Sequence, residues 1–139
     1  MTFVTNSEEE TEESGEKLAS ELPCGSIVAL CGDLGSGKTA FVRGMARGLG
    51  INDPVSSPTF TVVNEYAGNK ELFHFDLYRL AGEDELFDIG WEDYLSRGGI
   101  CAVEWSEKAA GAFPGNETRV FFERLSENSR KITISGPDR

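Results

Sequence analysis

The chain has 139 residues, a length that fits one compact domain with a buried core and requires no disulfide framework. Hydrophobic residues make up 39% and charged residues 27% of the chain, which argues against a disordered or fibrous protein. The 24 acidic and 13 basic residues give a net charge of −11, so the chain is poorly suited to bind a nucleic-acid backbone by broad electrostatic attraction. If the protein serves a nucleic acid, we expect another protein to hold that nucleic acid.

The composition also bears on location. No apolar run approaches the roughly 18 residues that a membrane span needs, and the first residues, MTFVTNSEEETEE, do not read as a signal peptide. We therefore expect a cytoplasmic protein without a membrane partner. Cys24, Cys31 and Cys101 lack CxxC spacing, which predicts small buried hydrophobic side chains in a reducing compartment, with no disulfide and no metal or redox site.

Three elements are expected in the first third of the chain. Residues 7–22 predict a helix with an acidic first turn, and its acidic run SEEETEESGE, residues 7–16, is expected to be a solvated face. SIVALC, residues 26–31, is typical of a strand buried on both faces. Apolar residues then recur at helical spacing from Phe41 to Leu49, and Gly50 can end that helix.

The glycine-rich stretch CGDLGSGKTAF, residues 31–41, lies between that strand and that helix. Gly32, Gly37, Lys38 and Thr39 fit the pattern GxxxxGK[ST] in the context where the pattern has a mechanism. Glycines let backbone N–H groups form a nest around phosphate oxygens, and the helix points its positive end at the same anion. Lys38 would reach the β and γ phosphates, and the Thr39 hydroxyl would bind the accompanying Mg²⁺. The alternative is a flexible turn with an exposed lysine.

Residues 55–80 predict a β-hairpin, with TFTVVNEY and KELFHFDLY as strands around the turn residues AGN. In the second strand the alternation sends one set of side chains to each face, with Phe73, Phe75 and Leu77 on one and His74, Asp76 and Tyr78 on the other. His74 is favoured as a hydrogen-bonded structural residue over a ligand or base. Asp76 could position Mg²⁺ through water or orient an attacking water, or could pair with a neighbour such as Arg79.

The remaining elements follow from the last third. Residues 82–95 suggest one amphipathic helix, and ICAV, residues 100–103, reads as a second buried strand. Glu104 follows that strand at the edge where open α/β sheets bind ligands. It is therefore a candidate Mg²⁺ ligand, and the alternative is an ordinary acidic residue at the end of a strand. Trp105 could pack on a nucleotide or complete the core. RVFFERL and RKITISG predict two closing strands.

Together these elements predict an α/β fold resembling the P-loop NTPases. We expect a central, mostly parallel sheet with an inserted β-hairpin and with helices on both faces, in a single domain spanning residues 1–139.

Four motifs, GDLGSGKTAFVRG, SPTF, HFDLYRL and VEW, resemble in their order and spacing the bacterial tRNA threonylcarbamoyladenosine biosynthesis family TsaE. The resemblance runs nearly end to end. It implies a P-loop ATPase, weak alone and stimulated by partners, that binds ATP and Mg²⁺ but does not transfer the threonylcarbamoyl group itself. Such proteins are needed to modify the adenosine beside the anticodon in tRNAs that read codons beginning with A. They act on a complex of TsaD and TsaB, so tRNA is met only through those partners.

The resemblance also implies site residues. The phosphates would be held by Gly35, Ser36, Gly37, Lys38, Thr39 and Ala40, with Ser36 standing where alanine is more usual. Thr39 and Glu104 look like the Mg²⁺ pair. Asp76 matches the acid implicated in hydrolysis, and Thr59 in SPTF resembles a switch-like residue near the γ-phosphate. Trp105 would join the nucleotide site, and Thr11 and Arg130 fall where the terminal segments of the family approach the nucleotide.

Two rival functions use the same motif. A small-molecule kinase would bring several arginines over the phosphates, yet the sequence offers only Arg43 and Arg47 as a cluster, on the helix after the glycine loop. A nucleotide-gated binding module would not need hydrolysis. GTP is not expected, because the guanine-reading NKxD pattern is only half met by NKEL at residues 69–72.

Overall fold

A computed structural model describes residues 1–33, 35–58 and 61–136. The strands are β1 (Thr2–Thr5), β2 (Ile27–Gly32), β3 (Val63–Tyr66), β4 (Leu72–Asp76), β5 (Ile100–Glu104), β6 (Thr118–Arg124) and β7 (Arg130–Ser135). The helices are α1 (Glu8–Glu21), α2 (Lys38–Gly48), α3 (Glu83–Asp88), α4 (Trp91–Ser96) and the 3₁₀ segment η1 (Ser106–Ala112).

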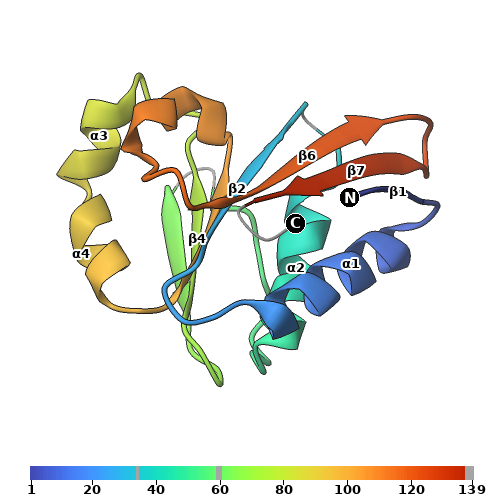
Figure 1. The fold of residues 1–139 in the computed structure, drawn as a ribbon, viewed down its shortest axis with the longest axis horizontal. Helices are drawn as coiled ribbons and strands as arrows, with labels where there is room; N and C mark the ends of the chain where they lie inside the picture. The colour runs from blue at the N-terminus through green and yellow to red at the C-terminus, as the bar shows by residue number, and fades with distance from the viewer. Residues whose placement is uncertain (34, 59–60, 137–139) are drawn as a thin grey trace.

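One sheet of seven strands organises the molecule, in the order β1-β7-β6-β2-β5-β4-β3. The four central strands β6, β2, β5 and β4 are parallel, whereas β3 pairs with β4, and β7 with β6 and β1, in antiparallel register. Helices α1 and α2 lie on one side of the sheet and α3 and α4 on the other (Figure 1). The expected α/β fold, with a parallel centre, a hairpin and helices on both faces, is confirmed.

Each face of the sheet carries its own core. Leu72, Ile100 and Ala102 point toward α1 and α2, where they meet Phe41 and further apolar side chains. The opposite face is aromatic: Phe73 and Phe75 meet side chains of α4, with Trp91 at 5.2 Å from Phe75 between ring centroids. The predicted alternation along the second hairpin strand is therefore confirmed, since Phe73, Phe75 and Leu77 all belong to this second core.

Three expectations about elements need correction. The helix expected over residues 82–95 is two short helices, because Gly90 adopts φ 95° and interrupts the hydrogen bonding between α3 and α4. Of the first hairpin strand expected over 59–66, residues 59 and 60 lie outside the described residues; in the described part the strand is Val63–Tyr66, and the preceding Val62 has φ 70°. The strand β1 and the segment η1 were not predicted at all. None of the helices in the described part of the chain has the length and apolarity needed to cross a bilayer.

The cysteines differ from one another. Cys101 is buried, as expected, and burial raises the pKa of its thiol to about 12. Cys24 is exposed and Cys31 is half-buried, so the expectation of three buried side chains is wrong for these two. All three thiols are free.

The acidic run of α1 is not simply a solvated face, which corrects that expectation. Arg43 of α2 lies 2.7 Å from both Glu8 and Glu12, and Arg47 lies 3.0 Å from both Glu12 and Glu16. These ion pairs join α1 to α2 along one edge of their contact. Because the side chains are partly exposed, each pair contributes at most about 1 kcal/mol, and their main effect is to fix the alignment of the two helices.

The helices α1 and α2 touch through glycines. A Cβ atom at Gly44 would overlap the backbone carbonyl of Glu12, and one at Gly15 would overlap the carbonyl of Phe41. Only glycine allows the two backbones to approach so closely. The position of α2, and with it the position of its N-terminus, therefore depends on these contacts.

We expect Gly44→Ala to lower the free energy of unfolding by about 1–3 kcal/mol, the usual cost of overpacking, although alanine is the better helix former. Chemical denaturation monitored by circular dichroism measures the change. Gly82→Ala is the matched control, because a Cβ there meets nothing within 4 Å and its φ of 179° suits any residue. Equal stability of the two variants would contradict the close-contact interpretation.

Candidate nucleotide-binding site

The loop between β2 and α2 leads into a helix end that has no side-chain cap. Gly37 is the N-cap residue of α2, with φ 105°, and provides no side-chain hydrogen bond. The first turn of α2 contains no acidic residue either. The first N–H groups of a helix have no partner within it, and its N-terminus carries a partial positive charge. This end of α2 is therefore suited to bind an anion.

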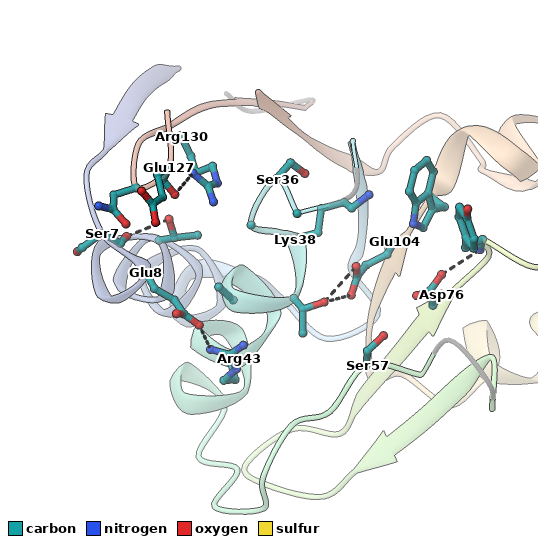
Figure 2. A pocket seen from close by; sticks show the side chains of 18 residues that line it. Ser7, Glu8, Ser36, Lys38, Arg43, Ser57, Asp76, Glu104, Glu127 and Arg130 are labelled. Atoms are coloured by element: carbon teal, nitrogen blue, oxygen red, sulfur yellow. Dashed lines mark hydrogen bonds and ion pairs between the residues drawn. The ribbon is translucent and has the colours of Figure 1, made fainter. Parts of the chain in front are cut away.

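A cavity of about 420 Å³ opens at this helix end. Figure 2 shows it between α1 and Arg130 on one side and Glu104 and Asp76 on the other. Of the residues proposed from sequence, those that line it are Thr11, Gly35, Ser36, Gly37, Lys38, Thr39, Ala40, Asp76, Glu104, Trp105 and Arg130. Thr59 lies outside the described residues. The structure thus gathers the rest of the expected set around one cavity.

Lys38 lines the cavity and is largely buried. Its side chain is 5% exposed, its ammonium donates to the backbone carbonyl of Gly32, and Nζ lies 3.7 Å from the centre of the Trp105 ring. Burial lowers the pKa of the ammonium, and the carboxylate of Glu104 is the largest of the charges that oppose this shift. An anion placed beside Lys38 would favour its charged form.

Thr39 and Glu104 meet across the same space. The Thr39 hydroxyl lies 3.3 Å from Oε1 and 3.1 Å from Oε2 of Glu104, to which it can donate. Glu104 is 3% exposed and ends strand β5, as expected. The same oxygen, Oε2, is also 2.5 Å from His74 Nε2. The favoured structural interpretation of His74 is therefore supported by its burial and hydrogen bond, but its partner is a candidate site residue.

Asp76 lies next to Glu104, because the two are register partners on strands β4 and β5. Its side chain is buried, and Oδ1 accepts a hydrogen bond of 2.9 Å from the backbone N–H of Tyr78. The two carboxylates thus reach the cavity from the C-terminal ends of neighbouring parallel strands. Open α/β sheets bind ligands at this edge.

The position of Trp105 is compatible with both roles that the sequence left open. It lines the cavity, and it also packs against the second core. Its backbone has φ 58°, an uncommon conformation for a residue with a large side chain. Its ring lies 4.9 Å from the ring of Tyr78, between centroids. Trp105 and Tyr78 therefore form an aromatic wall beside Lys38.

The opposite wall comes from the two ends of the chain. The Thr11 hydroxyl lies 2.7 Å from that of Thr5, and Arg130 Nη1 donates to the backbone carbonyls that precede it, those of Ser126, Glu127 and Ser129. Among the residues that the structure describes, the buried Nε of Arg130 and the buried hydroxyl of Ser36 have no hydrogen-bond partner. Both residues line the cavity.

Several lining residues were missed from the sequence: Ser7, Glu8, Arg43, Ser57, Tyr78, Glu127 and Asn128. Ser7, Glu8, Glu127 and Asn128 belong to a loop or a helix start that carries no motif. Arg43, Ser57 and Tyr78 had a detectable signal, because they lie within the quoted motifs GDLGSGKTAFVRG, SPTF and HFDLYRL. Arg43 and Arg130 are the arginines among the lining residues, and both are already hydrogen-bonded to protein groups.

The oxygen atoms of Thr39 and Glu104 suit Mg²⁺ better than a cation that takes all of its ligands from the protein. Within residues 1–33, 35–58 and 61–136, no group of three or more His, Cys, Asp or Glu side chains converges on a metal-sized site. Mg²⁺ is usually held by one or two protein oxygens together with phosphates and waters. Thr39 and Glu104 provide one hydroxyl and one carboxylate beside the uncapped end of α2.

Comparisons with known proteins agree along nearly the whole chain. The family described as "Threonylcarbamoyl adenosine biosynthesis protein TsaE" matches residues 5–132. Two relatives bear the name tRNA threonylcarbamoyladenosine biosynthesis protein TsaE. The one from Treponema pallidum is 38% identical over 135 residues, which is 97% of this chain and 100% of the relative. The one from Bacillus subtilis is 39% identical over 136 residues, 97% of this chain and 85% of the relative.

A crystal structure of YdiB from Bacillus subtilis has the same fold, with a TM-score of 0.84 and 32% identity over 98% of this chain and 84% of that one. The overall fold described above is thus shared with an experimentally determined structure. With a family match over residues 5–132 and relatives of this identity, the chain belongs to the TsaE family of threonylcarbamoyl adenosine biosynthesis proteins.

Proposed function

We propose that this protein binds ATP with Mg²⁺ and hydrolyses the nucleotide to support threonylcarbamoyl modification of the adenosine beside the anticodon of tRNAs that read codons beginning with A. Membership of the TsaE family supports the pathway. The observation that carries the biochemical part is the uncapped N-terminus of α2, with the buried Lys38 and the Thr39–Glu104 pair beside it.

The triphosphate would lie against the glycine loop. Backbone N–H groups from Gly35 to Ala40 would donate to phosphate oxygens, and the positive end of α2 would favour the same negative charge. Lys38 would exchange the Gly32 carbonyl and the Trp105 ring for the β and γ phosphates. The nucleoside would extend toward Thr11 and Arg130, whose Nε has no hydrogen-bond partner within the described part of the chain.

Thr39 and Glu104 would hold the cation. When bound, Mg²⁺ would neutralise part of the charge that builds up on the phosphates during transfer. Glu104 is suited to this because it is buried and fixed at a strand end, whereas Thr39 begins α2 and lies within reach of the same phosphates. The direct hydrogen bond between the two keeps them adjacent without the cation.

Asp76 would act on the attacking water. In hydrolysis, a water oxygen bonds to the γ phosphorus, the bond to the β–γ bridging oxygen breaks, and ADP and phosphate leave. The Tyr78 N–H fixes one oxygen of Asp76, so the carboxylate can accept a hydrogen bond from that water in a set orientation. Thr59, outside the described residues, is proposed to act near the γ-phosphate on the strength of its SPTF motif.

The proposed partners are the TsaD and TsaB proteins, with tRNA met only through them. The net charge of −11 supports this division, because an acidic protein is poorly suited to bind the tRNA backbone itself. The kinase alternative is less favoured, since Arg43 is engaged by Glu8 and Glu12 rather than directed at the place of the phosphates. Stimulation of weak intrinsic hydrolysis by the partners is part of this proposal.

We expect Lys38→Ala to collapse the threonylcarbamoyladenosine content of total tRNA in cells whose only copy carries the variant. The reason is that loss of the ammonium removes charge stabilisation worth on the order of 10²-fold in rate. Mass spectrometry of tRNA nucleosides measures the content. Lys17→Ala, at an exposed position of α1, is the matched control and should leave the content unchanged. Normal modification with Lys38→Ala at normal abundance would contradict the proposed function.

We expect Asp76→Asn to bind ATP and Mg²⁺ with nearly unchanged affinity but to hydrolyse ATP on the order of 10²- to 10⁴-fold more slowly, because the amide keeps the bond to Tyr78 and loses the charge. Release of labelled phosphate in the presence of the partners measures hydrolysis. Label transferred to another molecule would favour a kinase. Full tRNA modification with Asp76→Asn would favour a nucleotide-gated binding module.

A further inference from the structure

The imidazole of His74 is placed where a hydrophobic side chain would suit the packing. It is the only histidine of the chain, it is 0% exposed, and its flanking neighbours on this face of the sheet, Leu72 and Ala102, belong to the core under α1 and α2. Burying a polar ring costs free energy unless its nitrogens are hydrogen-bonded. The reason for a histidine here must therefore lie in what the ring contacts.

That contact is the Glu104 carboxylate. His74 Nε2 lies 2.5 Å from Oε2, and Nδ1 has no hydrogen-bond partner in the described structure. An ionised carboxylate only accepts hydrogen bonds, so we assign the proton to Nε2 from this network. The ring thus directs its one satisfied polar atom at one oxygen of Glu104.

The two partners of Glu104 differ in how firmly they are held. His74 is locked in the centre of β4, two residues before Asp76, and reaches Glu104 diagonally across the β4–β5 pairing. Thr39, by contrast, is half-buried at the start of α2, and its contacts of 3.1 and 3.3 Å to the carboxylate are longer. Glu104 is therefore held by a short bond from the sheet, and on the side of the glycine loop it is met by the longer contacts of Thr39.

We propose that His74 is a positioning residue that fixes the Glu104 carboxylate, through the Nε2–H bond, for the cation of the nucleotide site. This inference rests on the proposed function, because it assigns His74 a role toward the Mg²⁺ that Glu104 would hold. Partners that orient a ligating carboxylate typically change metal affinity by about 10- to 100-fold when removed. His74 would act through Glu104 and would touch neither nucleotide nor metal.

A pair of amide variants isolates the hydrogen bond. The side-chain nitrogen of His74→Gln can reach the place of Nε2, whereas that of His74→Asn is one methylene too short, although both bury an amide at the same site. The readout is Mn²⁺ affinity for the complex with ADP, measured by electron paramagnetic resonance, together with ADP affinity without metal. We expect His74→Asn to weaken Mn²⁺ binding by about 10- to 100-fold and His74→Gln to bind Mn²⁺ nearly as tightly as wild type. The affinity for ADP without metal should be unchanged in both variants.

Phe75→Leu controls for a general loss of packing, because Phe75 lies on the same strand but faces the other core. It should lower the melting temperature and leave Mn²⁺ affinity unchanged. Equal Mn²⁺ affinities for the Asn and Gln variants would overturn the inference. A loss with Asn that Phe75→Leu reproduces would overturn it as well.

Nuclear magnetic resonance of the single imidazole separates this inference from the proposed function. In the wild-type protein without nucleotide, we expect a slowly exchanging Nε2–H proton that moves when Glu104→Gln is introduced. If that proton is absent or does not respond, the His74 inference is wrong whatever the site binds. If the proton behaves as expected but the wild-type protein binds neither ADP nor Mn²⁺–ADP, the proposed function is wrong. The inference about His74 is then wrong too, because it rests on that function.

Discussion

The open N-terminus of α2 is the feature on which the rest of the structure depends. A helix end whose N–H groups lack both a capping side chain and an acidic first turn is costly to leave unsatisfied and favours a bound anion. Gly37 removes the side chain that would cap it, and Lys38 adds a buried positive charge beside it. The close contact at Gly44 then fixes where this charged end points, because α2 cannot shift without moving α1.

The sheet supplies the complementary groups from its other strands. Parallel β4 and β5 end side by side, so Asp76 and Glu104 arrive together at the edge that α2 faces. Each strand is buried on both sides, toward the helices α1 and α2 on one face and toward an aromatic core on the other. Acidic side chains tolerate such burial only where they are hydrogen-bonded or face a cation. Glu104 is hydrogen-bonded to His74, and Asp76 accepts a hydrogen bond from the Tyr78 N–H. The ammonium of Lys38 attracts both carboxylates.

The sequence predicted well those features that depend on residues close together in the chain. The glycine pattern before Lys38 and the strand-end position of Glu104 depend on neighbours in the chain, and the structure brings both residues to one cavity. The break at Gly90 was missed because helical periodicity continues across a single glycine. The bond between His74 and Glu104, and the pairing of Arg43 with α1, join residues 30 or more positions apart. Such contacts depend on strand register and helix packing, which no local pattern specifies.

The strand β1 also has a consequence for how the protein is made. Residues 2–5 pair with residues 130–133, and the cavity wall opposite Trp105 combines Thr11 with Arg130. Ribosomes synthesise a chain from its N-terminal side at roughly 5–20 residues per second. Residues 2–5 therefore emerge well before residues 130–133, and they cannot pair until that later strand has been made. A chain that lacks β7 can contain the glycine loop, but it lacks the wall of the cavity that Arg130 provides.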